Sequence, residues 1–219
     1  MQLKLLSHHI LTPDVRSYSF VVDSDSPGAA FPFEAGQFVM LKQLEAEKKY
    51  ARAFSFACAP TAHEITFLMK HNPDGHISGY LAQSEPGTKI DVSKPMGRFI
   101  LNPADTDRVY IATGTGIAPI ISFIESNSSV PATILFGVRT NSDLFWQEKL
   151  PANSLITLTQ PTEEWSGCVG RVTAYVPDLL SKHPNAAWYI CGNPEMVMEV
   201  RAQLLSAGAA PLNIHFEIY

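Results

Sequence analysis

The sequence has 219 residues, which is the size of one large domain or two small ones. Its 16 Lys and Arg residues against 21 Asp and Glu residues give a formal net charge of −5. Because the chain is mildly acidic and has no basic cluster, it does not have the pattern of a nucleic-acid-binding protein. Hydrophobic residues make up 46% and charged residues 17%, which is typical of a globular protein and excludes a disordered chain.

The three cysteines, Cys58, Cys168 and Cys191, lack the spacing of a metal site. An iron–sulfur cluster normally requires four thiolates, so we expect neither a cluster nor another metal in this chain. A sparse, odd cysteine count is also more typical of a reducing compartment than of a disulfide framework. Residues 1–10 lack the apolar core of a signal peptide, and residues 109–124 are too short and too interrupted to span a bilayer. We therefore expect a cytoplasmic protein with no membrane span.

The first hundred residues contain short segments rich in β-branched and aromatic residues, which predict strands. These predicted strands are residues 16–22, 37–41, 52–57 and 65–69. Turn signals separate the segments, at residues 26–28, 60–61, 72–75 and 85–87. A short helix is predicted at residues 78–84. Many short strands at this spacing indicate a small antiparallel barrel or sandwich.

Beyond residue 106 the pattern changes to strands that alternate with helices. The predicted strands are residues 108–112, 133–137, 155–158, 188–190 and 214–218. The predicted helices are residues 117–125, 144–150, 172–180 and a helix after Asn193. Asn193 is suited to cap that last helix, Pro194 to its first position and Gly208 to its end. Such alternation predicts a parallel sheet with helices on both faces, and places a domain boundary between residues 101 and 107.

Two glycine-containing loops follow predicted strands of the second half. The first, Gly114–Thr115–Gly116, leads into a helix, and the second is Cys191–Gly192–Asn193–Pro194. Glycine lets a backbone approach a ligand closely, and the helix N-terminus behind it suits a pyrophosphate. Ligands of open α/β sheets bind at the carboxyl ends of the strands, so both loops are expected at one crevice. An ordinary strand–helix connection is the alternative for either loop, and a small apolar filler is the alternative for Cys191.

Three further segments carry candidate ligand groups. In Arg52–Ala53–Phe54–Ser55, the guanidinium and the phenyl ring share a strand face and suit a phosphate and a planar cofactor; the alternative is an edge arginine beside a core phenylalanine. Gly75–His76–Ile77–Ser78 reads as a turn into a helix with Ser78 near the N-cap, either binding a phosphate or only capping the helix. At the end of the sequence, Glu217 and Tyr219 share a strand face, with a frayed tail as the alternative.

These segments have the order and spacing of the ferredoxin–NADP reductase superfamily of FAD-dependent oxidoreductases, which the chain resembles over nearly its whole length. Residues 52–55 resemble the flavin motif Arg-x-Tyr/Phe-Ser, and residues 75–78 resemble the segment that binds the FAD pyrophosphate. Residues 95–99 resemble the stretch that closes the barrel, and the two glycine loops resemble the nicotinamide-nucleotide loops. The resemblance implies an N-terminal FAD-binding antiparallel β-barrel of Greek-key type at residues 1–101. It implies a C-terminal α/β parallel-sheet domain that binds NAD(P) at residues 106–219.

The activity implied by the resemblance is that of an FAD-dependent NAD(P)H oxidoreductase. Such an enzyme takes hydride from NADH or NADPH onto FAD and passes electrons to a separate acceptor such as ferredoxin, flavodoxin or an oxygenase component. One alternative is an NAD(P)H:flavin reductase, which uses flavin as a substrate. Another is a non-catalytic flavin-binding electron-transfer subunit or redox sensor.

Site residues also follow from the resemblance. Ser55, Cys191 and Glu217 are expected to be catalytic, with Phe54 stacked on the isoalloxazine and Tyr219 covering its other face until nicotinamide binds. The residues expected to bind FAD are Arg52, Ala53, Phe54, Ser55, Lys70, Gly75, His76, Ile77, Ser78, Thr115 and Tyr219. The residues expected to bind NAD(P)H are Gly114, Thr115, Gly116, Arg139, Cys191, Gly192, Asn193 and Pro194.

The chain departs from the family pattern in two places. Phe54 stands where tyrosine is commoner, which removes a phenol and lowers the expected affinity for FAD. Residues 158–164 contain two acids, Glu163 and Glu164, where plant-type members have basic residues that hold a 2′-phosphate. Because like charge near a phosphate is unfavourable, this segment favours NADH. Arg139 and Arg171 remain as candidate partners of a 2′-phosphate, so NADPH stays open.

Overall fold

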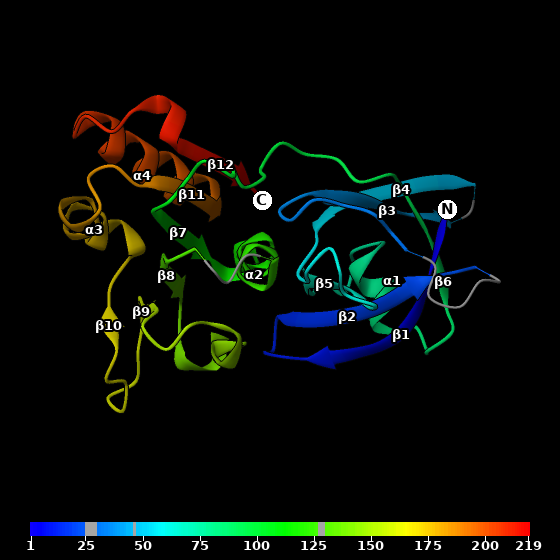
Figure 1. The fold of residues 1–219 in the computed structure, drawn as a ribbon. Coiled ribbons are helices and arrows are strands. Elements are labelled where there is room, and N and C mark those ends of the chain that lie inside the picture. The colour runs from blue at the N-terminus through cyan, green and yellow to red at the C-terminus, as the bar shows by residue number, and fades with distance from the viewer. Residues whose placement is uncertain (25–29, 46, 127–129) are drawn as a thin grey trace.

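The computed structural model describes residues 1–24, 30–45, 47–126 and 130–219. Two β-sheets, one in each half of the sequence, lie side by side, and the C-terminus lies at the boundary between the halves (Figure 1). The turn predicted at residues 26–28 falls outside the described residues. Within those ranges, no helix is both long and apolar enough to cross a membrane.

The first half is an antiparallel sheet in which six strands are described. They are β1 (Gln2–Ile10), β2 (Val15–Val22), β3 (Phe38–Glu45), β4 (Lys48–Ser55), β5 (Ile65–Lys70) and β6 (Lys89–Val92), in the spatial order β4-β3-β6-β1-β2-β5. The ends of the sheet meet beyond β4, where Phe56 bridges Phe67 and the Ala57 amide donates to the Thr66 carbonyl at 2.8 Å. The sheet therefore closes into a barrel, with β6 inserted between β3 and β1 as in a Greek key.

Aromatic side chains fill the barrel and its open end. Phe20, Phe56 and Phe67 are fully buried, and Phe33 stacks on Phe56 with the ring centroids 3.7 Å apart. Helix α1 (Ser78–Ala82) follows β5 and buries Leu81 in the same core. The sequence pattern did not predict β1, whose alternation is broken by a register shift between Leu5 and Ser7, nor the four-residue β6.

The second half is a parallel sheet with six strands in the described ranges. They are β7 (Arg108–Thr113), β8 (Ala132–Val138), β9 (Leu155–Leu158), β10 (Cys168–Val169), β11 (Ala187–Gly192) and β12 (Ile214–Ile218), in the order β10-β9-β8-β7-β11-β12. The central strands β7 and β11 are buried almost throughout, as expected for a sheet that is covered on both faces.

Helices cover the two faces of this sheet, as the alternating pattern predicts. Helix α2 (Ile117–Ser126) packs on the face that carries Tyr110 and Ala112. Helices α3 (Val176–Lys182) and α4 (Pro194–Ser206) pack on the face that carries Val109 and Ile111. The predicted cap of α4 is confirmed, because the Asn193 side chain accepts hydrogen bonds from two amides of the first turn.

The helix predicted at residues 144–150 is wrong. A single 3₁₀ turn, Gln147–Lys149, lies in this stretch instead, and another, Asn141–Asp143, precedes it. Phe145 and Trp146 pack into the core beneath them, and Trp146 adopts a left-handed backbone conformation with φ 52°. Burial of two adjacent aromatic side chains therefore outweighs the helical preference of the local sequence.

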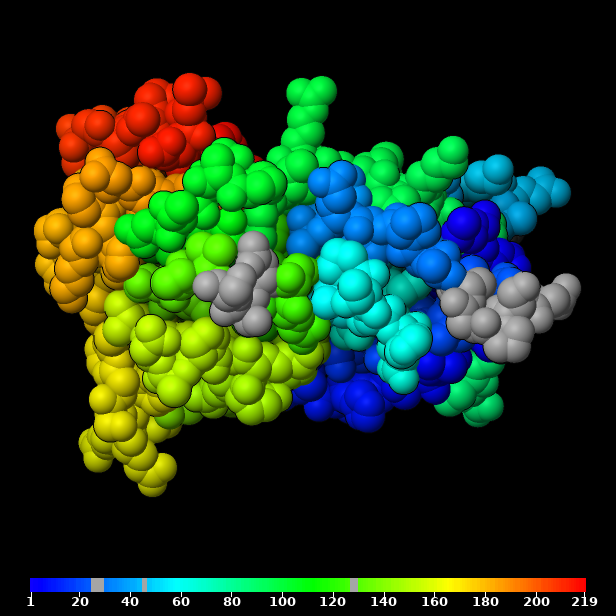
Figure 2. Space-filling view, viewed as in Figure 1, coloured from blue at the N-terminus to red at the C-terminus, as the bar shows by residue number. Residues whose placement is uncertain are grey.

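The two halves share a hydrophobic core through α2, which lies between the parallel sheet and the barrel (Figure 1). Phe123 of α2 packs against Phe99 from the first half, with ring centroids 5.3 Å apart. Val15, Ala57 and Leu68 of the first half belong to the same buried cluster. The space-filling view shows the two halves in contact along a continuous boundary (Figure 2). The relative position of the two sheets is therefore fixed by packing as well as by the connecting chain.

Gly36 lies at this boundary, and we expect Gly36→Ala to destabilise the protein strongly. A Cβ at Gly36 would overlap the Phe99 carbonyl oxygen and the Phe123 ring, and the residue has φ +90°. The backbone penalty is about 1–2 kcal/mol, and overpacking adds about 1–3 kcal/mol. Gly87→Ala is the matched control, because φ is +98° there and nothing lies within 4 Å of the new Cβ. Urea unfolding of both variants measures the difference, and equal losses would contradict the close packing of Phe99 and Phe123 around Gly36.

Candidate functional site

The site lies where the strand order of the parallel sheet reverses. From β7 the chain proceeds outward through β8 on one side and later through β11 and β12 on the other, so the ends of β7 and β11 flank a topological switch point. Ligands of open α/β sheets bind in the crevice at such a point. The two predicted glycine loops lie at the ends of these strands, with Gly114–Thr115–Gly116 directly after β7 and Gly192–Asn193 where β11 ends.

The two glycine loops pack directly on each other. A Cβ added to Gly116 would lie 2.6 Å from the Gly192 Cα, and a Cβ added to Gly192 would lie 2.9 Å from the Thr113 carbonyl oxygen. The Asn193 amide also donates a hydrogen bond of 3.2 Å to Thr113 Oγ1. The two loops therefore lie together, as the sheet rule predicts. Thr113, which sequence reasoning did not single out, ties the loops together.

Strand β12 brings the end of the sequence to the same place. Glu217 pairs in register with Cys191 of β11, and the Tyr219 amide donates to the Gly192 carbonyl at 3.2 Å. This pairing excludes the frayed-tail alternative. Ser55 Oγ, at the end of β4 in the barrel, donates to Glu217 Oε1 at 3.0 Å. The structure thus brings together Ser55, Cys191 and Glu217, the three residues predicted to be catalytic.

Burial controls the protonation of these groups. It raises the pKa of the Glu217 carboxyl, while the hydrogen bond from Ser55 lowers it. Burial raises the pKa of the Cys191 thiol well above its usual value, the Glu217 charge adds to the shift, and hydrogen bonding to Tyr219 opposes it. The pKa of the Tyr219 phenol is also raised well above its usual value, chiefly by burial of the hydroxyl, although 43% of the residue's surface is exposed. Cys191 and Tyr219 are therefore neutral at physiological pH.

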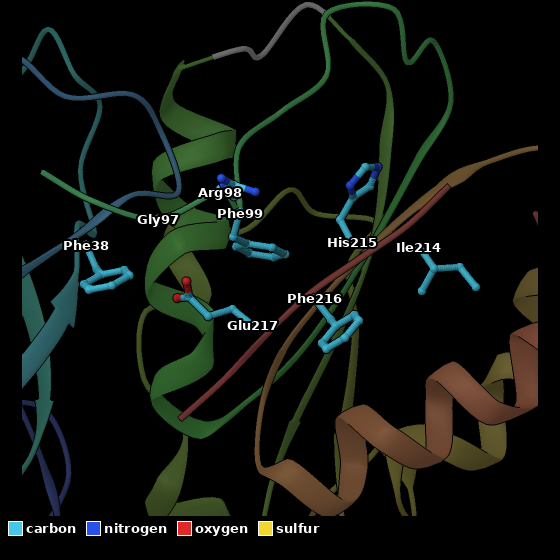
Figure 3. A pocket seen from close by; sticks show the side chains of 8 residues that line it. All are labelled: Phe38, Gly97, Arg98, Phe99, Ile214, His215, Phe216 and Glu217. Carbon is cyan, nitrogen blue, oxygen red and sulfur yellow. The ribbon is translucent and has the colours of Figure 1, made fainter. Parts of the chain in front are cut away.

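A cavity of about 340 Å³ lies beside Glu217, between β12 and the barrel (Figure 3). Its lining is Phe38, Gly97, Arg98, Phe99, Ile214, His215, Phe216 and Glu217. The Glu217 carboxylate points toward the side of the cavity where Phe38 lies, and Phe38 is the cross-strand partner of Ser55. Glu217 therefore contacts the buried Ser55 hydroxyl while also bordering an open space.

The predicted flavin strand β4 presents aromatic and cationic groups at the barrel surface. Phe54 is half-buried and packs on the barrel core, whereas Arg52 is exposed and donates to the neighbouring Ala51 carbonyl at 2.9 Å. Tyr50, two residues before Arg52 on the same strand face, stacks on His76 with centroids 3.4 Å apart. The predicted pyrophosphate segment 75–78 therefore lies against β4. The period-two spacing of Tyr50, Arg52 and Phe54 could have revealed Tyr50 from the sequence.

Ser78 lies next to the N-cap of α1, as predicted, but its side chain does not cap the helix. The N-cap of α1 is Ile77, whose side chain is buried in the barrel core. The Ser78 hydroxyl instead donates to the Asn72 carbonyl at 3.0 Å and accepts from the Asn72 amide at 3.2 Å. Gly75 is packed against this hydroxyl, since a Cβ there would lie 2.6 Å from it. Ser78 therefore holds the turn at residues 72–75 in shape.

The remaining predicted residues are exposed or half-buried. Lys70 is exposed at the end of β5, Thr115 is half-buried in the first glycine loop, and Ala53 and Pro194 are exposed at the surface. Arg139 follows β8, and its carbonyl accepts a hydrogen bond of 2.7 Å from the Gln160 amide. The segment that carries Glu163 and Glu164 therefore begins beside Arg139.

The donor groups of the site fit an FAD bound along the barrel with a nicotinamide nucleotide facing it. An exposed guanidinium, an aromatic ring and a buried hydroxyl follow one another at Arg52, Phe54 and Ser55. The paired glycine loops supply the close backbone approach that a dinucleotide needs. A flavin barrel joined to a switch-point crevice defines a two-domain oxidoreductase that combines FAD with a nicotinamide coenzyme.

Comparison with known proteins leads to the same class. Residues 2–100 match the family described as "Oxidoreductase FAD-binding domain", and residues 110–202 match "Oxidoreductase NAD-binding domain". The chain is 32% identical to ferredoxin–NADP reductase B of Sorangium cellulosum over 239 aligned positions, covering 100% of this chain and 97% of that protein. It therefore belongs to the ferredoxin–NADP reductase family and is an FAD-dependent NAD(P)H oxidoreductase.

Two further comparisons extend this result. The chain is 29% identical to the ferredoxin–NAD(P)+ reductase component of a naphthalene dioxygenase and salicylate hydroxylase system of a Ralstonia species, with 85% of this chain and 60% of that protein covered. The fold matches a ferredoxin–NADP+ reductase structure from Neisseria gonorrhoeae with a TM-score of 0.85, at 24% identity, over 100% of this chain and 98% of that one.

The three free thiols allow a direct check of the site's burial. Cys191 is 0% and Cys58 5% exposed, and burial raises the pKa of Cys58 to about 11, whereas Cys168 is half-buried. Because the thiolate is the reacting form, we expect Ellman's reagent at pH 7.5 to label one thiol per native chain rapidly. Cys168→Ser should abolish that phase. Rapid labelling that persists in Cys168→Ser would show that a buried thiol is accessible.

Proposed function

We propose that this protein oxidises NADH in preference to NADPH and delivers the electrons, through FAD, to a separate redox protein. The observation that carries the proposal is the Ser55–Glu217 hydrogen bond, which joins the flavin strand to the edge of the nucleotide-binding sheet across 162 positions of sequence. It supports the assignment of both halves to one reaction centre. Domain limits of 1–101 and 106–219 and a cytoplasmic location accompany the proposal, the latter because free thiols suit a reducing compartment.

FAD, when bound, supplies two-electron acceptance and one-electron release. In our proposal the residues of this chain position and protect that chemistry. Phe54 and Tyr219 would hold the flavin ring, and Arg52 would bind the phosphates of FAD. Ser55 holds a proton at its hydroxyl oxygen, with Glu217 as the acceptor that orients it. The neutral Cys191 packs beside the hydride path without adding charge.

Ferredoxin, flavodoxin and an oxygenase component are the acceptors we propose. The names of the Sorangium and Ralstonia relatives, a ferredoxin–NADP reductase and a reductase component of an oxygenase system, support such a partner. An NAD(P)H:flavin reductase is the second candidate, because Phe54 lacks the phenol expected to help retain FAD. Gel filtration separates the two, since a flavin reductase loses its yellow flavin during the run.

Preference for NADH is supported by charge in the loop after β9. Glu163 and Glu164 are exposed there, and the loop is anchored by the Gln160–Arg139 backbone hydrogen bond. Two carboxylates disfavour a 2′-phosphate nearby. Arg139 and Arg171 are both exposed and are the groups through which NADPH would be accommodated.

With ferricyanide as acceptor, we expect kcat/KM for NADH to exceed that for NADPH, measured from the loss of absorbance at 340 nm. Replacing Glu163→Gln and Glu164→Gln together should raise kcat/KM for NADPH about tenfold at low ionic strength and change that for NADH little, because like-charge repulsion is removed. Glu148→Gln, another exposed acid, is the control. Absence of oxidation of either nucleotide by protein that retains FAD would refute the reductase function.

Ser55→Ala should slow flavin reduction by NADH about 10²-fold, the lower end of what a positioned proton donor contributes. The variant lacks the hydroxyl that contacts Glu217, so the pKa of the Glu217 carboxyl should rise further. Stopped-flow absorbance of the flavin measures the rate. Ser55→Thr, which retains a hydroxyl, is the comparison. An unchanged rate in Ser55→Ala would remove Ser55 from the reaction.

A further inference from the structure

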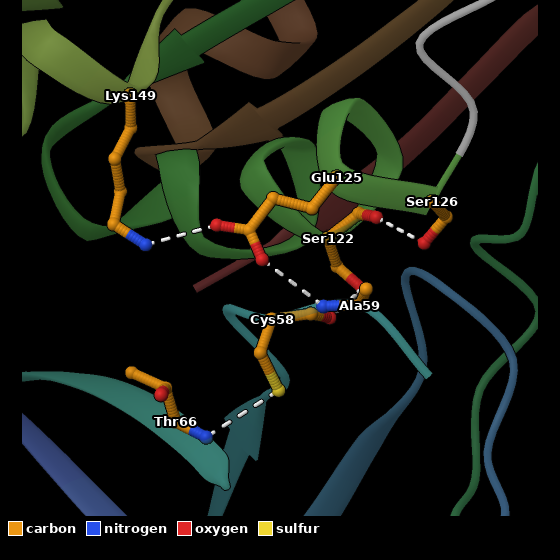
Figure 4. Close-up of polar contacts among 7 residues, drawn as sticks. All are labelled: Cys58, Ala59, Thr66, Ser122, Glu125, Ser126 and Lys149. Carbon is orange, nitrogen blue, oxygen red and sulfur yellow. Dashed lines mark hydrogen bonds and ion pairs between the residues drawn. The ribbon is translucent and has the colours of Figure 1, made fainter. Parts of the chain in front are cut away.

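Helix α2 carries a polar contact between the two halves that no step above uses (Figure 4). Ser122 Oγ donates to the Cys58 carbonyl at 2.6 Å, and the Ala59 amide donates to Glu125 Oε2 at 3.2 Å. The other oxygen of Glu125 pairs with Lys149 Nζ at 2.9 Å. We call Cys58, Ala59, Ser122 and Glu125 the α2 clamp. The first two lie in the barrel half and the last two on α2.

Both ends of the clamp connect directly to the reaction centre. Cys58 is three residues after Ser55, and the residues between them, Phe56 and Ala57, are fully buried and held by the pairing that closes the barrel. On the other side, α2 begins at Ile117, immediately after Gly116 of the first glycine loop. One helix therefore has the nucleotide loop at its N-terminus and is bonded, through Ser122 and Glu125, to the segment that follows the flavin strand.

The two contacts of the clamp differ in burial, because the Ser122–Cys58 hydrogen bond is buried whereas the Ala59–Glu125 hydrogen bond is exposed to solvent. Ser122 is fully buried and Cys58 is 5% exposed, so the hydrogen bond between them lies in a medium of low dielectric, where such a bond is strong. Without the Ser122 hydroxyl, the buried Cys58 carbonyl would lose that partner. The Cys58 side chain accepts from the Thr66 amide at 3.4 Å, and burial raises the pKa of its thiol to about 11. The thiol is therefore uncharged at neutral pH and adds no repulsion beside Glu125.

We propose that Ser122 and Glu125 are positioning residues that set the separation between the nicotinamide held by the glycine loops and the flavin held by Phe54 and Ser55. They touch neither cofactor and act through α2. Hydride transfer requires the two reacting atoms about 3–3.5 Å apart, and a misplacement of about 1 Å costs about 10²-fold in rate. A helix bonded to both halves removes the sliding that would produce such a misplacement.

The test uses the FAD-loaded enzyme and the variants Ser122→Ala, Glu125→Ala and Glu125→Gln. We expect Ser122→Ala and Glu125→Ala to lower the rate of flavin reduction by NADH about tenfold and to weaken the long-wavelength charge-transfer absorbance between flavin and nicotinamide. The KM for NADH should change less than twofold. Glu125→Gln should recover most of the rate, because its amide oxygen still accepts from the Ala59 amide. Glu199→Gln is the matched control, since Glu199 is an exposed acid on α4 that hydrogen-bonds Gln203.

A merely structural clamp gives a different result. Lower melting temperatures with an unchanged reduction rate and charge-transfer band would overturn the proposal, and so would an effect confined to KM. If Ser122→Ala does not fold, the comparison of Glu125→Ala with Glu125→Gln is sufficient. Equal rates of flavin reduction in these two variants would contradict the proposal. The two proposals can fail separately. If the wild-type enzyme shows the charge-transfer band with bound nucleotide but does not oxidise NADH, the proposed function is wrong. The clamp is then tested by comparing the charge-transfer absorbance of the wild type with that of the variants.

Discussion

Direct backbone contact between the turn after β7 and the turn after β11 determines where everything else in the site lies. Gly116 and Gly192 leave no room for a side chain between the two turns. The contact is imposed by the sheet, because β7 and β11 are hydrogen-bonded neighbours that end at the same edge. It sets the start of α2 behind Gly116 and places β12 one strand further out, so that Glu217 meets Ser55 from the other half.

Among Ser55, Cys191, Glu217 and Tyr219, the carboxyl of Glu217 is the group that can carry a charge at neutral pH. Cys191 and Tyr219 are neutral because burial raises the pKa of each, and the pKa of Glu217 is raised as well. A fixed charge near a group that gains or loses electrons alters its energy most where water is excluded. With a thiol, a phenol and a hydroxyl as its neighbours, the Glu217 carboxyl is the one source of such a perturbation among these four groups, and it is also the one that borders the open cavity.

The sequence predicts the two-sheet architecture because its signals are local: period-two alternation in the barrel and continuous apolar strands in the second half. It fails where tertiary packing decides, as at residues 144–150, where Trp146 takes a left-handed conformation to bury its ring. The glycine loops are predicted from spacing and a sheet rule, and their contact is confirmed. Other contacts join residues that are apart in the sequence, so no single segment predicts them. Examples are the Ser55–Glu217 hydrogen bond, the Tyr50–His76 stack and the Ser78–Asn72 hydrogen bonds. Only the resemblance grouped Ser55 with Glu217.

The two halves match two separate family models, which suggests that each half could be exchanged for the corresponding half of a relative. The packing around Gly36 contradicts that view, because Phe123 of one half occupies the place that a side chain on Gly36 of the other would need. In a chimaera joined at residue 101, positions 36 and 123 would come from different proteins. The two halves would then pack poorly unless the residues at these positions were exchanged together. Which recombinants of such reductases can fold therefore depends more on the fit of the side chains between the two halves than on sequence similarity within either half.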